Sequence, residues 1–151
     1  MKQTSMKYPQ AGVSLLELMI VVAIVAIVSG IAFPSYMQYV VNTKRTVATS
    51  TLLQVADRQQ QFFMDNKQYT NDLTDLGFAA NPLVLADDST VAAAGDADAV
   101  YSISLSNIAA TTYTITAAPL HGQASRDTDC ASLTLDQAGA RGNSAGGSDC
   151  W

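Results

Sequence analysis

The stretch VSLLELMIVVAIVAIVSGIAF, residues 13–33, is apolar almost throughout, and its one charged residue is Glu17. At a rise of about 1.5 Å per residue, about 20 helical residues cross a bilayer core of roughly 30 Å, so this stretch is long enough to span a membrane. It is also longer than the roughly 7–15 apolar residues of an ordinary secretory signal. Lys2 and Lys7 precede it without any acid, which predicts a cytoplasmic N-terminus and an exported remainder.

Glu17 is not explained by a cleaved secretory signal, a plain membrane anchor or a buried core helix. A carboxylate in an apolar membrane helix costs roughly 2.5–3.5 kcal/mol, so such a charge usually has a partner. A cut after Gly12 would give Val13 a free α-amino group and leave Glu17 near the start of the helix, where the helix dipole favours an anion. We therefore expect Glu17 to neutralise the amine of a neighbouring subunit.

The run from Gly12 to Ile24 closely resembles the class III signal of type IV prepilins. This resemblance implies that a prepilin peptidase cuts after Gly12, that Val13 is N-methylated, and that Glu17 guides assembly. The family usually has Phe where this chain has Val13, which puts only the efficiency of processing in question. The resemblance also implies an α+β fold, the type IV pilin fold. In it a long N-terminal α-helix, apolar in its first half and amphipathic in its second, packs on a C-terminal antiparallel β-sheet.

Three regions follow from this interpretation: a leader peptide at residues 1–12, a transmembrane and assembly helix at 13–34, and a head at 35–151. Gly30 and Pro34 form a weak point between the last two, because proline has no N–H to donate and disfavours helix in the residue before it. Two interpretations stay open here. The helix ends at the membrane boundary, or this segment kinks or melts in the fibre.

After Pro34 the apolar residues recur every seven positions, which predicts a helix over about 35–65 with one buried face. The stripe comprises Val41, Ala48, Val55 and Phe62, widened by Leu52 and Phe63, while Lys44, Arg45, Asp57, Arg58 and Gln60 fall elsewhere. Residues 66–99 are rich in Asp, Asn, Gly and Pro and predict an irregular, solvated loop. Their acids do not follow the offsets of a calcium-binding EF-hand loop.

Alternating apolar and polar residues predict three half-buried strands in the second half of the chain. They lie near residues 101–106, 112–117 and 131–136, and the link over 107–111 is short enough for an antiparallel hairpin. Together they would cover the apolar stripe of the helix.

The last quarter holds both cysteines, Cys130 and Cys150. They are either two buried thiols or one disulfide, and export of the chain favours the disulfide. A bridge would stabilise the Gly- and Ser-rich tail, by roughly 3 kcal/mol in the chain-entropy model. We expect Trp151 to pack on the sheet. The stretch from Arg45 to Thr70 resembles minor pilins of the PilE type, although this match is looser than that of the N-terminal signal. The Cys-Trp ending resembles the same group.

Composition argues against several other functions. The net charge of −5 disfavours a general polyanion binder, so the sequence gives no support for a nucleic-acid partner. One histidine, His121, and no cluster at metal-ligand spacing predict no metal site. We find no catalytic motif, and we expect neither an enzyme nor a cofactor.

The hypothesis is therefore a minor pilin, held in the bacterial inner membrane as a precursor and then built into an extracellular pilus with other major and minor pilins. The resemblance implies pilus biogenesis, twitching motility and adhesion as functions of the whole fibre. The alternatives are a pseudopilin of a type II secretion system and a membrane-anchored protein that binds DNA or a surface ligand without polymerising.

Overall fold

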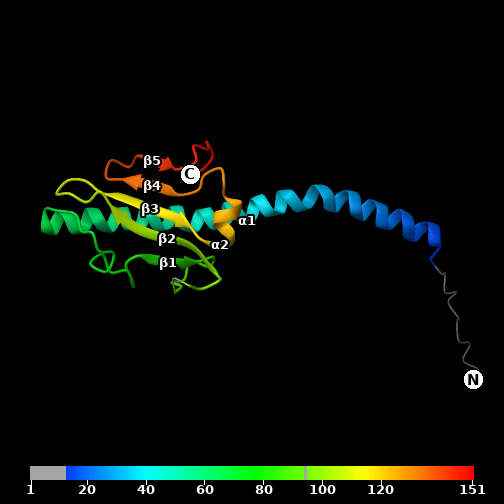
Figure 1. Cartoon of the computed structure of the whole chain (residues 1–151), viewed down its shortest axis with the longest axis horizontal. Coiled ribbons are helices and arrows are strands. Elements are labelled where there is room, and N and C mark those ends of the chain that lie inside the picture. Colours follow the sequence, from blue (N-terminus) through cyan, green and yellow to red (C-terminus); the bar gives the residue numbers. More distant parts are fainter. Residues whose placement is uncertain (1–12, 94) are drawn as a thin grey trace, which may run out of the picture. The chain divides into compact units, whose positions relative to one another are not determined.

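The computed structural model describes residues 13–93 and 95–151, so the predicted leader lies outside the described residues. The chain divides into two compact units, Met1–Gln38 and Tyr39–Trp151, which we describe separately. The elements are α1 (Leu15–Asn66), β1 (Leu83–Ala86), β2 (Ala99–Ser106), β3 (Thr114–Pro119), α2 (His121–Arg126), β4 (Leu133–Asp136) and β5 (Arg141–Asn143) (Figure 1).

Helix α1 continues through Pro34, so the interpretation of a helix end at this position is wrong. Pro34 has no N–H, and the Gly30 carbonyl therefore lacks the usual helical hydrogen bond from the residue four positions on. The side chain of Ser35 donates to the carbonyl of Ile31 at 3.4 Å. Gly30 and Pro34 thus both lie inside a continuous helix.

The five strands form one antiparallel sheet in the order β1-β2-β3-β4-β5, which confirms the predicted hairpin and the α+β fold class. Cross-strand pairing sets the inner face. Ile103 lies opposite Ala117, which in turn lies opposite Leu133. Because side chains alternate along a strand, this register places every second residue of β2, β3 and β4 on the face that α1 covers.

The apolar stripe predicted for the second half of α1 is buried in the core of the head. Val41, Ala48, Leu52 and Val55 are buried, and Phe62 is half-buried beside them. The prediction was wrong for Arg45, which belongs to the buried face although it was placed outside the stripe.

The stretch 66–99 is less irregular than predicted, because it contains β1, whose first three residues are buried. Its acids serve local turns. Asp72 accepts hydrogen bonds from the backbone and hydroxyl of Thr74, and Asp88 accepts the same pair from Thr90. These bonds lower the pKa of both carboxyls.

Besides β1, two short elements were not predicted. His121, expected in a loop, begins α2 with a left-handed backbone (φ 43°). Strand β5 lies in the Gly-rich tail and pairs with β4. Strand β4 begins at Leu133 and not at Ala131, because Ala131 also has a left-handed backbone (φ 50°) that cannot continue a strand.

Candidate functional site

The first unit presents an uncovered apolar surface. Residues 13–36 are all exposed, and Val13, Ile20 and Phe33 have exposed fractions of 70%, 52% and 67%. By length and composition, α1 is able to cross a membrane. Exposed apolar surface of this extent marks a lipid or protein interface.

Glu17 lies in the first turn of α1, where Ser14 caps the helix. The backbone N–H of Glu17 donates to the Ser14 hydroxyl at 3.1 Å, and the N–H of Leu18 donates to the Ser14 carbonyl at 3.2 Å. Ser14 and Glu17 are three residues apart, as in a capping box. This spacing is visible in the sequence and could have predicted that the helix begins next to Ser14. Val13 lies just outside the helix, and Gly12 lies outside the described residues.

The head contains a buried ion pair that the sequence analysis missed. The guanidinium of Arg45 donates to the carboxylate of Asp127 through Nε at 3.2 Å and through Nη2 at 2.6 Å. The side chains are 10% and 0% exposed, respectively. The hydrogen bond to Asp127 raises the pKa of Arg45 more than burial lowers it, so the arginine stays charged.

Two more side chains complete this buried network. Tyr101 donates its hydroxyl to Asp127 at 3.0 Å. The amide of Gln123 donates to the Tyr101 hydroxyl, to Asp127 and to the carbonyl of Val41. Burial raises the pKa of Tyr101 well above its ordinary value. The network therefore joins α1, β2 and α2, and its members hold one another in fixed positions.

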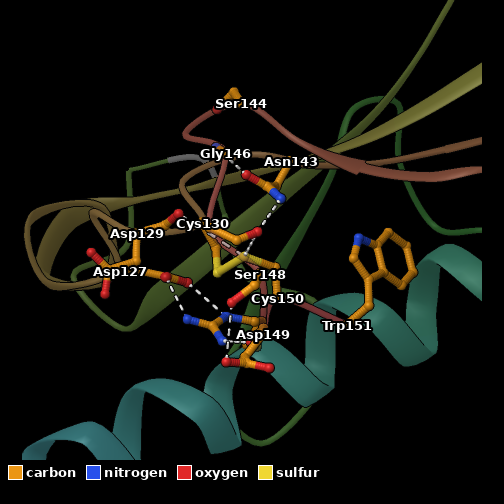
Figure 2. The surroundings of a disulfide bond; sticks show 12 residues. Asp127, Asp129, Cys130, Asn143, Ser144, Gly146, Ser148, Asp149, Cys150 and Trp151 are labelled. Atoms are coloured by element: carbon orange, nitrogen blue, oxygen red, sulfur yellow. Dashed lines mark hydrogen bonds and ion pairs between the residues drawn. A yellow bond between two sulfur atoms is a disulfide. The ribbon is translucent and has the colours of Figure 1, made fainter.

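Cys130 and Cys150 form a disulfide next to this network, with their Cα atoms 5.5 Å apart (Figure 2). One backbone and one side-chain hydrogen bond fix the segment that it closes. The N–H of Gly147 donates to the carbonyl of Asp129 at 3.0 Å, and the Asn143 amide donates to the carbonyl of Gly147 at 2.9 Å. The Gly- and Ser-rich tail is therefore a tied loop.

Trp151 packs on the edge of the sheet, as predicted. Its indole N–H donates to the carbonyl of Gly142 in β5 at 3.0 Å, and the guanidinium of Arg141 lies 5.3 Å from the centre of its ring. Arg141 and Arg126 are exposed basic side chains of the head. Within residues 13–93 and 95–151, no three His, Cys, Asp or Glu side chains are grouped so as to hold a metal ion.

A periodic signal for Arg45 was available in the sequence. Arg45, Leu52 and Gln59 are spaced by seven residues, and all three are buried. A second heptad row therefore runs beside the row of Val41, Ala48 and Val55, but two of its three members are polar. A search for apolar residues alone passes over it.

Comparisons with known proteins place the chain in a family. A family model described as "Type IV minor pilin ComP, DNA uptake sequence receptor" matches residues 34–134, and a "Prokaryotic N-terminal methylation motif" matches residues 7–33. The chain is 35% identical over 68 residues to the type IV major pilin protein PilA of Myxococcus xanthus, covering 45% of this chain and 31% of that protein. It is 33% identical over 81 residues to a fimbrial protein of Pseudomonas aeruginosa, covering 50% and 53%.

A type IV pilin of Shewanella oneidensis aligns in structure with a TM-score of 0.45 and 19% identity, covering 71% of this chain and 92% of that one. The chain spans about a third of the length of the Myxococcus xanthus relative and about half of that of the Pseudomonas aeruginosa relative. The minor pilin model matches well over half of the chain. The chain belongs to the type IV minor pilin family.

Proposed function

We propose that this minor pilin is a structural subunit of a type IV pilus and that it enters the fibre through residues 13–34. The observation that carries the proposal is the exposed apolar surface of α1, with one carboxylate in its first turn. An apolar helix face in water is unfavourable, and packing against lipid or against like helices removes that cost. The precursor rests in the inner membrane, and the mature subunit packs against other pilins.

The resemblance to prepilins suggests how this exchange is directed. A prepilin peptidase cuts between Gly12 and Val13, and N-methylation modifies the amine of Val13. Glu17 then lies at the positive end of its own helix and offers a negative charge at the depth where the amine of the next subunit arrives. The pair would satisfy two charges that are each costly in an apolar bundle.

The continuous helix across Gly30 and Pro34 is consistent with a segment that bends or melts on assembly. Because Pro34 cannot donate a backbone hydrogen bond, this turn is weaker than the rest of the helix even before the subunit contacts a neighbour. Pilus biogenesis, twitching motility and adhesion follow as functions of the fibre. A pseudopilin of a type II secretion system shares this architecture, and deletion of the gene separates the two, because loss of pili with intact secretion supports the pilin.

A variant of Glu17 tests the proposal. Glu17→Gln keeps the size of the side chain but removes its charge, and we expect at least a tenfold lower amount of the subunit in sheared surface fibres at an unchanged amount in the membrane. Asp57→Asn is the matched control, since Asp57 is an exposed carboxylate on the same helix. Normal incorporation of the Glu17→Gln variant would contradict the assembly role. Mass spectrometry of the native subunit should show N-methyl-Val13 at its start.

A second candidate function is binding of DNA by the head, because the matching family model describes a DNA uptake sequence receptor and covers residues 34–134. Acidic residues outnumber basic ones 13 to 8 in the chain, so binding would depend on a few exposed cations such as Arg126 and Arg141. In gel-shift experiments with duplex DNA, the double variant Arg126→Ala/Arg141→Ala should bind about tenfold more weakly, with a smaller salt dependence. An absence of binding at low salt would remove this candidate.

A further inference from the structure

Arg45 contacts both segments that carry the cysteines. It donates to the side chain of Asp127, three residues before Cys130, at 3.2 and 2.6 Å. Through Nη1 it also donates to the backbone carbonyl of Asp149, directly before Cys150, at 2.9 Å. One side chain of α1 therefore bonds to both segments, in addition to the disulfide that joins them. Figure 2 shows Asp127 and Asp149 on either side of this disulfide.

The geometry of the arginine makes this double contact effective. A guanidinium is planar and presents its N–H groups in fixed directions, so three bonds from one group fix the relative position of their acceptors. Arg45 is buried, which keeps water from competing for these acceptors. Its position on the buried face of α1 anchors both segments to this helix.

We propose that Arg45 is a positioning residue for closure of the Cys130–Cys150 disulfide, because folding around it brings the two thiols side by side before they are oxidised. Closure needs an external disulfide or an equivalent two-electron oxidant. One protein thiolate attacks the external disulfide and releases one thiol. The second protein thiolate then attacks the mixed disulfide and releases the other thiol. Two protons and two electrons leave the cysteines, and one S–S bond forms.

The contacts of Arg45 favour closure because they raise the effective concentration of one thiol near the other. Two thiols joined only by a flexible chain meet at effective concentrations on the order of millimolar. Segments already held by Arg45, and by the bonds from Gly147 to Asp129 and from Ser144 to Ser132, bring the sulfur atoms together more often. Coupling is reciprocal, so a contact that favours closure is stabilised by closure to the same extent.

The test measures the closure equilibrium of the full-length chain in detergent micelles with glutathione and glutathione disulfide. Alkylation of free thiols and mass spectrometry give the fraction closed. We expect Arg45→Met to lower the closure constant at least tenfold. Lys44 is the neighbouring cation and forms a partly exposed pair with Asp87 at 4.0 Å, so Lys44→Met should leave the closure constant within twofold. In 6 M guanidinium chloride the closure constants of the wild type and both variants should be equal, because the denatured chains lack the contacts of Arg45.

A further control separates positioning from general loss of stability. Tyr101→Phe removes a buried hydrogen bond to Asp127 but leaves both contacts of Arg45, so it should destabilise the head while changing the closure constant less than threefold. A closure constant for Arg45→Met within threefold of the wild type, or an equal loss in Tyr101→Phe, would overturn the proposal.

Hydrogen exchange on the reduced wild-type chain decides the matter if Arg45→Met does not fold. The backbone N–H groups of Ser144 and Gly147 donate to the carbonyls of Ser132 and Asp129, which lie close to Cys130 in the sequence. The proposal requires both N–H groups to exchange at least tenfold more slowly in the reduced chain than in the denatured chain. Exchange as fast as in the denatured chain would refute the idea that the segments are held before the bond closes.

Discussion

Removal of the carboxylate of Asp127 should be among the most damaging single changes in the head. The side chain is fully buried and accepts hydrogen bonds from Arg45, Tyr101 and Gln123. Asp127→Ala would leave the Arg45 charge buried beside two donors without their acceptor. Breaking one partner of a buried ion pair typically costs about 3–5 kcal/mol, a large part of the roughly 5–15 kcal/mol that stabilises a domain.

Thermal unfolding followed by tryptophan fluorescence measures this effect. Trp151 is the one tryptophan of the chain, and it lies against β5, so its emission reports unfolding of the head. At roughly 4 °C per kcal/mol for a domain of this size, we expect the Tm to fall by roughly 12–20 °C.

Two controls set the scale. Lys44→Ala removes a partly exposed ion pair with Asp87 and should change the stability by less than about 1 kcal/mol. Arg45→Met combined with Asp127→Leu removes both charges and should be less destabilised than Asp127→Ala alone, because no unpaired charge remains buried. A Tm of Asp127→Ala within 3 °C of the wild type, on the roughly 4 °C per kcal/mol scale, would refute the reasoning.

Three more outcomes are expected. Burial raises the pKa of Tyr101, so the stabilisation that it gives the folded state is complete below about pH 10 and falls at higher pH by up to about 1.4 kcal/mol per pH unit. Urea unfolding at about pH 9–11 should show that the free energy of unfolding falls less steeply with pH in Tyr101→Phe than in the wild type. An equal fall in both would contradict this expectation. Gln59→Ala should cost about 2 kcal/mol in urea unfolding, because Gln59 donates to and accepts from the buried backbone of Thr70, whereas exposed Gln61→Ala should cost little. Gly147→Ala would place its Cβ against the Asp129 backbone and should lower the stability by about 1–3 kcal/mol in the same assay, while Gly95→Ala, with open space around it, should not.

The sequence determined those parts of the protein that depend on local pattern. The heptad stripe and the alternating strands each repeat at the period of one kind of secondary structure, and the apolar run at 13–33 is long enough for a membrane helix. These patterns predicted α1 and three of the five strands. The basis for expecting a disulfide was likewise the export signal together with the cysteine count.

Only the tertiary structure decided the features that join distant segments. The heptad row of Arg45, Leu52 and Gln59 could have indicated that Arg45 is buried. No local pattern points to its partner, Asp127, which lies 82 positions away. Strands β1 and β5 are short, and their pairing with β2 and β4 stabilises them against the turn-forming composition of their own segments. Local sequence specifies which surface an element buries, whereas the partner of a buried charge is fixed only when the whole chain has folded around it.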